Sequence, residues 1–155
     1  WCIMLYAFDL DGTLISSYMD NPGKDYHTWS VLPGRVEMLR QLHSAGHTIA
    51  IISNQGGVAF GMVNEADWQQ KIDAVASQLP IDAVFVCFAD VRSRDPRYSD
   101  PAQVARRKPS GAMLKEAIEF FGANDVIYVG DRPEDEQAAA DAGVPFVWSQ
   151  EFFHE

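Results

Sequence analysis

Two carboxylates lie two positions apart near the start of the chain, directly after an apolar segment. Residues 1–8 are all apolar, and Asp9-Leu10-Asp11-Gly12-Thr13 follows them. An apolar run of this length is typical of a strand that is buried on both faces. Because side chains alternate along an extended chain, Asp9 and Asp11 point the same way. Like charges this close repel each other unless a cation or a shared proton relieves them, so the pair indicates a metal site, an acid/base pair or both.

An Asp-Gly pair after a strand also marks an ordinary turn, and taken alone this segment is equally consistent with a turn and with a site. Later parts of the chain supply further polar side chains, and these decide between the two interpretations. They are Ser53, Asn54, Lys108 and Asp131. In a doubly wound sheet the carboxyl ends of the strands share one edge, where such sheets bind ligands. We therefore expect these side chains and the aspartate pair to line one cleft.

Three of these side chains, Asp9, Asp11 and Asp131, are carboxylates with few softer ligands nearby in the sequence. Hard oxygen ligands of this kind favour a hard cation. Magnesium takes one or two protein carboxylates, retains water and accepts its remaining oxygens from a phosphate. The carboxylates therefore predict a Mg²⁺ site with a phosphorylated ligand.

The remaining polar groups suit the phosphate itself. Lys108 cannot bind a metal while it is protonated, and its charge suits a phosphate or a developing anion. Ser53 and the backbone amides of Gly12 and Thr13 are candidate donors to the other phosphate oxygens. Hydrolysis of a phosphomonoester is among the slowest uncatalysed reactions, which makes charge neutralisation and covalent catalysis together a plausible requirement.

Apolar runs alternate with amphipathic segments along the rest of the chain. We expect strands over 1–8, 47–53, 81–88, 125–129 and 144–148, helices over 33–46, 64–79, 110–121 and 133–143, a loop or short hairpin over 15–31 and a long loop over 89–108. Asn64 and Ser110 are expected helix N-caps, and Gly122 and Gly143 are expected helix ends. The pattern predicts an α/β fold of three layers, doubly wound around a mainly parallel five-stranded sheet.

The size of the chain bounds its organisation. A chain of 155 residues is expected to form a single domain over residues 1–155. Because the first residue is not Met, this domain is either a whole protein or one domain of a longer chain. The sequence gives no indication of the oligomeric state.

Composition excludes several classes of protein. The net charge of −10 argues against a protein that coats nucleic acid non-specifically. No apolar run approaches the roughly 20 residues of a membrane helix, and no basic segment precedes the N-terminal run as in a signal peptide, so we expect a cytoplasmic location. Cys2 and Cys87 lie in separate apolar runs and are expected to be reduced and buried. The histidines show no metal-ligand spacing with them, and no zinc is expected.

The basic residues are concentrated in one segment. Six of the twelve lysines and arginines lie within residues 92–108, where Asp95 and Asp100 are the only acidic residues. Such a cluster is either a solvated loop or a surface that attracts an anionic substrate, and the sequence does not favour one of these over the other.

Four segments together resemble the motifs of the haloacid dehalogenase-like (HAD) phosphatases. Residues 8–14 match the first motif, Ser53-Asn54-Gln55 the second, Lys108-Pro109 the third, and residues 130–135 (Gly-Asp-Arg-Pro-Glu-Asp) the fourth. Each motif is weak alone, but the ordered set, at strand ends over nearly the whole chain, is highly specific. The resemblance implies a Rossmann-like fold and a phosphoric monoester hydrolase.

The resemblance also implies roles for the carboxylates, which the residues alone leave unassigned. Asp9 is the expected nucleophile, which forms an aspartyl-phosphate. Asp11 is expected to protonate the leaving group and then to deprotonate the hydrolytic water. The ligands implied for Mg²⁺ are Asp9, the backbone carbonyl of Asp11, and Asp131.

Further residues are implied to bind the phosphate or to support the site. The implied phosphate and substrate contacts are Gly12, Thr13, Ser53, Asn54, Arg107 and Lys108. Arg132 and Asp135 are expected to support them. Asp135 either supports the metal ligands or stabilises the N-terminus of its helix, and both remain open.

The spacing of the motifs suggests a branch of the family. Neither gap is long enough for a large cap domain, which implies an open cleft bordered by residues 15–31, 56–62 and the basic segment. The motifs are similar to the branch of histidinol-phosphate, heptose bisphosphate and polynucleotide 3′-phosphatases. Members with a zinc loop carry cysteines where this chain has Cys87 alone. Trp29 and the closing Glu151-Phe152-Phe153 are more similar to the polynucleotide phosphatases.

The expected substrate is therefore a nucleic acid with a 3′-phosphate. The alternatives are a small molecule of the heptose bisphosphate or histidinol phosphate type, or a non-catalytic module that binds phosphate. The intact set of Asp9, Asp11, Lys108 and Asp131 argues against the non-catalytic alternative.

Overall fold

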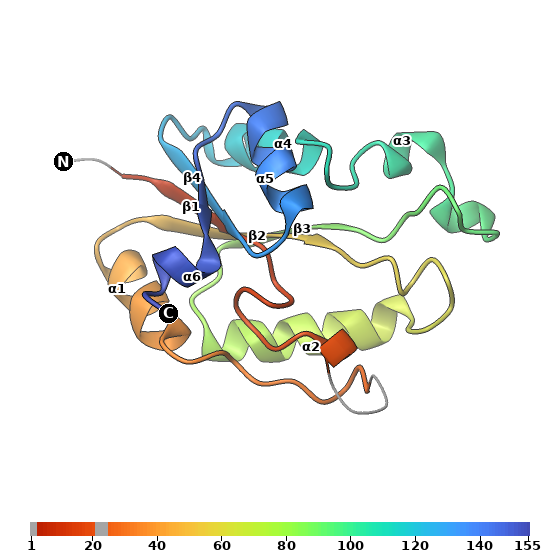
Figure 1. The fold of residues 1–155 in the computed structure, drawn as a ribbon, viewed down its shortest axis with the longest axis horizontal. Coiled ribbons are helices and arrows are strands. Elements are labelled where there is room, and N and C mark those ends of the chain that lie inside the picture. The colour runs from red at the N-terminus through yellow and green to blue at the C-terminus, as the bar shows by residue number, and fades with distance from the viewer. Residues whose placement is uncertain (1–2, 21–24) are drawn as a thin grey trace.

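A sheet of five parallel strands forms the centre of the computed structural model, which describes residues 3–20 and 25–155 (Figure 1). The strands are β1 (Leu5–Phe8), β2 (Thr48–Asn54), β3 (Ala83–Cys87), β4 (Val126–Gly130) and β5 (Phe146–Trp148), in the order β3-β2-β1-β4-β5. The central strand is β1, in which Phe8 aligns with Ile51 of β2 and Val129 of β4. The aspartate pair thus leaves the middle of the sheet.

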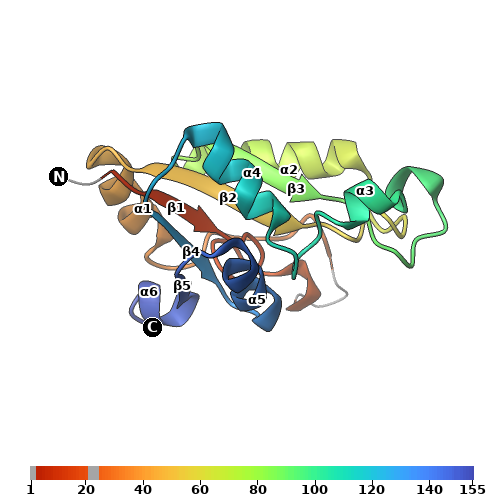
Figure 2. The same ribbon diagram turned by 90° about the horizontal axis from the view of Figure 1, so that it is seen from above.

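Helices cover both faces of the sheet (Figures 1 and 2). One face is covered by α1 (Arg35–Ser44), α2 (Glu65–Gln78) and α6 (Ser149–Phe152), and the other by α4 (Ala112–Phe121) and α5 (Pro133–Ala142). Shorter helices are η1 (Tyr18–Asp20), η3 (Pro96–Tyr98) and α3 (Pro101–Val104). The predicted three-layer, doubly wound fold is confirmed.

Strand β1 contributes to two separate cores because its side chains alternate. Leu5 and Ala7 pack with Met113 and Ala138 from α4 and α5, while Phe8 packs on the opposite face against helices α1 and α2. Both faces of the central strand are therefore buried, as its uninterrupted apolar sequence predicts.

Most helix boundaries follow the predicted capping residues. The Asn64 side chain accepts a hydrogen bond of 2.8 Å from the amide of Asp67 at the start of α2. Gly122 and Gly143 end their helices in the left-handed region, with φ of 61° and 71°. At α4 the N-cap is Gly111 rather than Ser110, although the Ser110 hydroxyl accepts from the Ala112 amide at 3.2 Å.

Other parts of the chain differ from the prediction. The predicted strand over 1–8 was too long, because β1 begins at Leu5 and Ile3 is 57% exposed; Cys2 lies outside the described residues. The loop over 15–31 closes with an antiparallel bridge between Ile15 and Val31. Helices η3, α3 and α6 lie in segments predicted as loop and tail. Among the described helices, none combines the length and apolar character needed to cross a membrane.

Arg35, the first residue of α1, contacts the turn after β1. Its side chain is fully buried, and its Nε donates to the backbone carbonyl of Thr13 at 2.8 Å. The same guanidinium pairs with Glu155 at 3.0 Å and lies 3.9 Å from the ring centroid of Phe153. A buried cation from α1 therefore joins the turn to the last residues of the chain.

The contact between α4 and α5 depends on the absence of a side chain at Gly111. A Cβ atom at this position would lie 2.7 Å from the backbone nitrogen of Ala142 and 2.8 Å from the carbonyl oxygen of Ala138. We predict that Gly111→Ala lowers the free energy of unfolding by about 1–3 kcal/mol, measured by urea denaturation.

The matched control is Gly57→Ala, whose nearest neighbouring atoms lie 3.4 Å from the added carbon. This variant should stay within about 1 kcal/mol of the wild type. Equal unfolding free energies for the wild type and the Gly111 variant would show that the two helices separate without cost.

Candidate active site

The turn after β1 brings together the carboxylates of Asp9 and Asp131, which are far apart in the sequence. The amide of Asp9 donates to the carbonyl of Val129 at 3.0 Å, which extends the pairing of β1 with β4 past the end of the strand. Gly12 then adopts φ of +84°, and a Cβ there would collide with Oδ2 of Asp131. Glycine is thus required both for the backbone conformation and for the approach of Asp131.

The backbone amides of Gly12 and Thr13, which the sequence predicts as donors to a phosphate, are hydrogen-bonded within the turn. The amide of Gly12 donates to the carbonyl of Ile15 at 2.7 Å, and that of Thr13 to Leu10 at 3.2 Å, so both are used within the turn. The Thr13 hydroxyl donates instead to Oδ1 of Asp131 at 3.2 Å. These two residues shape the turn and orient Asp131.

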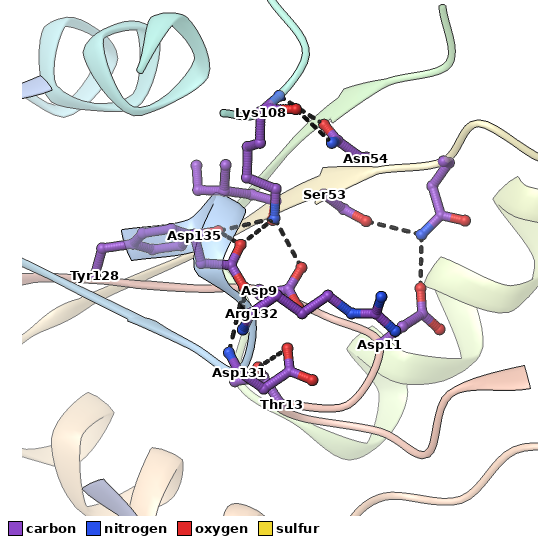
Figure 3. A network of polar contacts seen from close by, with 12 residues as sticks. Asp9, Asp11, Thr13, Ser53, Asn54, Lys108, Tyr128, Asp131, Arg132 and Asp135 are labelled. Carbon is purple, nitrogen blue, oxygen red and sulfur yellow. Dashed lines mark hydrogen bonds and ion pairs between the residues drawn. The ribbon is translucent and has the colours of Figure 1, made fainter. Parts of the chain in front are cut away.

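The Lys108 ammonium lies at the centre of the site, among groups from several elements (Figure 3). Its Nζ donates to Oδ1 of Asp9 at 2.8 Å and to Oδ1 of Asp135 at 2.7 Å. The Tyr128 hydroxyl, at 2.9 Å, and the Ile52 carbonyl, at 3.1 Å, complete its surroundings. The lysine is only 5% exposed, so strands β1, β2 and β4 and helix α5 all contribute to holding one buried cation.

Burial and charge act in opposite directions in this cluster. Burial raises the pKa of the Asp9 carboxyl well above its ordinary value, although the Lys108 ammonium favours the charged form. For Lys108 itself burial lowers the pKa, but Asp9, Tyr128 and Asp135 outweigh it and raise the pKa well above the ordinary value. Lys108 is therefore a permanent positive charge beside Asp9. A divalent cation here would favour the ionised form of Asp9.

Asn54 fixes the backbone of Lys108. Its Oδ1 accepts from the Lys108 amide at 2.9 Å, and its Nδ2 donates to the Lys108 carbonyl at 3.1 Å. The Asn54 amide thus positions the lysine, and Asn54 also lines the active-site cleft, so its contact with substrate stays a prediction. Ser53, one residue earlier, is buried, and its hydroxyl accepts from Nε2 of Gln55 at 2.7 Å.

Asp135 lies at the start of α5 with both carboxylate oxygens in use. Its Oδ1 accepts from Lys108 and from the Tyr128 hydroxyl at 2.8 Å, and its Oδ2 accepts from the amides of Asp131 and Arg132 at 3.2 Å. Asp135 therefore caps its helix and anchors Lys108 at the same time.

The carboxylates fit a hard divalent cation. Oxygens of Asp9, Asp131 and Asp135 lie within 4.8 Å of one another. Because N–H and O–H donors occupy both oxygens of Asp135, Asp9 and Asp131 are the better ligands. Two carboxylates with room for water and phosphate oxygens form the kind of site that Mg²⁺ prefers.

Asp11 lies apart from this cluster, with a donor on each of its oxygens. Nε2 of Gln55 donates to its Oδ2 at 2.8 Å, and Nζ of Lys71 lies 3.3 Å from its Oδ1. Lys71 is not among the site residues that the sequence motifs predict. Its position three residues after Trp68 and four before Val75 places it on the buried stripe of α2, and a lysine on such a stripe was the available signal.

Asp9, Asp11, Lys108 and Asp135 open onto a cleft of about 700 Å³, whose lining does not include Asp131 or Ser53. Its lining residues are Asp9, Asp11, Ser17, Tyr18, Met19, Asn54, Gln55, Gly56, Gly57, Phe60, Met62, Arg92, Arg107, Lys108, Pro109, Arg132, Glu134 and Asp135. Phe60 is 47% and Met62 60% exposed, so large apolar side chains lie at its rim.

The basic segment is largely paired with carboxylates. Arg97 pairs with Asp95 at 2.7 Å, and Arg106 with Glu116 at 2.7 Å. The segment is therefore not a uniform positive surface.

Two arginines of the segment do reach the cleft. Arg92 and Arg107 approach the buried Asp90 at 3.0 and 3.6 Å, and both line the cleft. The guanidinium of Arg92 also lies 5.5 Å from the ring centroid of Phe60. A nearby hydrogen bond of 2.6 Å, from the Ser93 hydroxyl to the Ala59 carbonyl, joins the two loops that carry these side chains.

The buried cluster gives a prediction about stability. Lys108→Met leaves the carboxylates of Asp9 and Asp135 buried without their cation, and we expect a loss of about 3–5 kcal/mol in the free energy of unfolding. The matched control is Lys115→Met on the exposed face of α4, which should change it by less than about 0.5 kcal/mol. Similar losses in both variants, measured by urea denaturation, would contradict the prediction.

Comparison with known proteins agrees with this geometry. The model of the family described as polynucleotide kinase 3 phosphatase matches residues 4–153. A D-glycero-beta-D-manno-heptose-1,7-bisphosphate 7-phosphatase of Rhodopseudomonas palustris is 32% identical over 121 residues, 74% of this chain. A 20.8 kDa protein of Autographa californica nuclear polyhedrosis virus is 29% identical over 129 residues, 81% of this chain. The chain spans 66% and 64% of the lengths of these relatives, just under two thirds.

The chain is also similar to a solved structure of a phosphatase. The D,D-heptose 1,7-bisphosphate phosphatase of Bordetella bronchiseptica, complexed with magnesium and phosphate, superposes with a TM-score of 0.73 at 27% identity. The match covers 93% of this chain and 79% of that one. The fold, the motifs and the family model agree, and the chain belongs to the polynucleotide kinase 3 phosphatase family, within the HAD superfamily of phosphatases.

Proposed function

We propose that this chain hydrolyses phosphomonoesters with Mg²⁺, through an aspartyl-phosphate on Asp9. The observation that carries the proposal is the convergence of Asp9, Lys108 and Asp131, from three separate segments, in one cluster, from which Asp9 and Lys108 line the cleft. Magnesium and phosphate in the Bordetella structure support the same chemistry. Asp9 and Asp131, with the backbone carbonyl of Asp11, would hold the cation, which supplies positive charge to the phosphoryl oxygens.

In the first step, a carboxylate oxygen of Asp9 attacks phosphorus while the bond from phosphorus to the leaving oxygen breaks. Asp11 gives its proton to that oxygen, so the alcohol leaves neutral. Lys108 and Ser53 stabilise the charge on the phosphoryl oxygens. The position of Lys108, 2.8 Å from Oδ1 of Asp9, supports this role.

In the second step, water attacks the phosphorus of the aspartyl-phosphate, and the bond from phosphorus to the Asp9 oxygen breaks. Asp11, now a carboxylate, accepts the proton of the water. Inorganic phosphate leaves, and both aspartates return to their starting protonation states.

For the substrate we propose a 3′-phosphorylated nucleic-acid end. The exposed ring of Phe60 offers a nucleobase a stacking surface, and Arg92 and Arg107 offer charge to a neighbouring phosphodiester. We expect Arg132, which also lines the cleft, to contribute to binding.

A cytoplasmic location stays a prediction of the sequence.

A small sugar bisphosphate is the second candidate. It is favoured by the activity for which the Rhodopseudomonas and Bordetella relatives are named. The two arginines near Asp90 suit a second phosphomonoester as well as they suit a phosphodiester. The candidates are therefore distinguished by whether Phe60 contacts a nucleobase of the substrate.

Removing the nucleophile tests the reaction. We predict that Asp9→Asn lowers Mg²⁺-dependent release of phosphate from an aryl phosphate by at least about 10³-fold, since an amide cannot form the acyl-phosphate. Chelation of Mg²⁺ in the wild type should abolish the same activity. Full activity of the Asn variant would exclude Asp9 as the nucleophile, whereas an inactive wild type in a broad panel would favour a phosphate-binding module.

The substrate is tested with Phe60→Ser. For a 3′-phosphorylated oligonucleotide we expect kcat/KM to fall by about 5- to 150-fold, which corresponds to the roughly 1–3 kcal/mol of one stacked base. Heptose 1,7-bisphosphate has no aromatic group, so its kcat/KM should change little. A wild type that prefers the sugar bisphosphate, with no effect of the substitution on the oligonucleotide, would favour the second candidate.

A further inference from the structure

We propose that Lys71 is a positioning residue, which holds the Asp11 carboxylate in the orientation needed to activate water in the second step. The inference rests on the proposed function, because it assigns Lys71 a part in the same reaction. It concerns a side chain on α2, outside all four sequence motifs, that does not line the active-site cleft.

The Lys71 ammonium is fixed by its surroundings. The residue is 5% exposed, and Nζ lies 4.1 Å from the ring centroid of Tyr26 and 5.6 Å from that of Tyr18. In the part of the chain that the structure describes, Asp11 is the carboxylate within ion-pair distance of it, at 3.3 Å. Burying an ammonium is costly unless a counter-charge compensates, so Lys71 and Asp11 hold each other in place.

The second oxygen of Asp11 is held from another side. Gln55 donates to Oδ2 at 2.8 Å through the same Nε2 that donates to the Ser53 hydroxyl at 2.7 Å. Donors from α2 and from the end of β2 thus fix both oxygens, and with them the plane of the carboxylate. One of the two anchors is tied to Ser53, the proposed phosphate contact.

Each oxygen of Asp11 accepts one hydrogen bond, since ammonium and amide N–H groups can only donate. Each oxygen also retains a further lone pair for a water molecule. Asp11 must leave one contact to act as the acid in the first step, whereas the second step uses it as it lies.

Packing alone does not require a lysine at this position. The neighbours of Lys71 on the buried stripe of α2 are Trp68, Ile72 and Val75, and a methionine of similar length would fill the same space without burying a charge. What the lysine adds to the stripe is a hydrogen-bond donor that reaches Asp11. Lys71→Met therefore removes the contact while it preserves most of the shape.

The experiment is pre-steady-state hydrolysis of 4-nitrophenyl phosphate with Mg²⁺. This substrate has a good leaving group, so the first step needs little help from an acid. For Lys71→Met we expect kcat to fall by about 10- to 100-fold, a part of the roughly 10²–10⁴-fold that a general base contributes. KM should fall by the same factor, kcat/KM should hold, and a burst of about one nitrophenol per active site should appear because the aspartyl-phosphate accumulates.

Two further variants make the result specific. Lys71→Gln keeps an N–H donor and should recover most of the lost kcat, and Lys115→Met removes a charge from the exposed face of α4 and should leave kcat and KM unchanged. Thermal unfolding of each variant monitors the fold. If Lys71→Met does not fold, Lys71→Gln carries the test and should show a smaller burst of the same kind.

The proposal is overturned if kcat is unchanged, or if kcat falls with KM constant and no burst. The second pattern is that of a smaller fraction of active protein, which a purely structural role predicts. A wild type that turns over no phosphomonoester would contradict the proposed function itself, and an active wild type with an unaffected Lys71→Met variant would contradict only the role of Lys71.

Discussion

The burial of one ammonium group, that of Lys108, determines how this edge of the sheet is assembled. Removing an ammonium and two carboxylates from water costs several kcal/mol per ion, and only close, well-directed contacts offset it. Asp9 and Asp135 lie 2.8 and 2.7 Å from Nζ, and Asn54 bonds the lysine backbone from β2. Strands β1, β2 and β4 and helix α5 must therefore be in register before the cation can be buried, which links correct folding to the geometry of the site.

Two glycines make this concentration of charge sterically possible. Gly12 leaves room for Asp131, and at Gly130 a Cβ would lie about 2.5 Å from the side chain of Asp135. Groups that converge this closely must be carried by rigid elements, and here they follow the central strands β1 and β4. The exposed side chains of the rim belong to loops. Reaction chemistry and substrate recognition are thus supported by different parts of the backbone.

The alternation of strands and helices along the chain, the three layers and most helix ends could be predicted from local sequence patterns. Apolar periodicity and helix capping depend on residues that are close in the sequence. The convergence of Asp9, Lys108 and Asp131 followed from the topology, which places all strand ends on one edge. Hydrogen bonds between distant segments, and those inside tight turns, could not be predicted from the sequence. The amides of Gly12 and Thr13 are used inside the turn, and Arg106 finds its carboxylate on α4. Such pairings depend on tertiary distances that no local pattern encodes.

The hydrogen bond from the Ser93 hydroxyl to the Ala59 carbonyl has an evolutionary consequence. It couples the loop that carries Phe60 to the loop that carries Arg92, so a change in the length or conformation of one loop displaces the other. Substitutions on these two loops should then be epistatic, because contacting or linked sites do not contribute additively. A new substrate preference would arise more readily through paired changes across both loops than through single changes in either. Relatives with different substrates are expected to differ in both loops together.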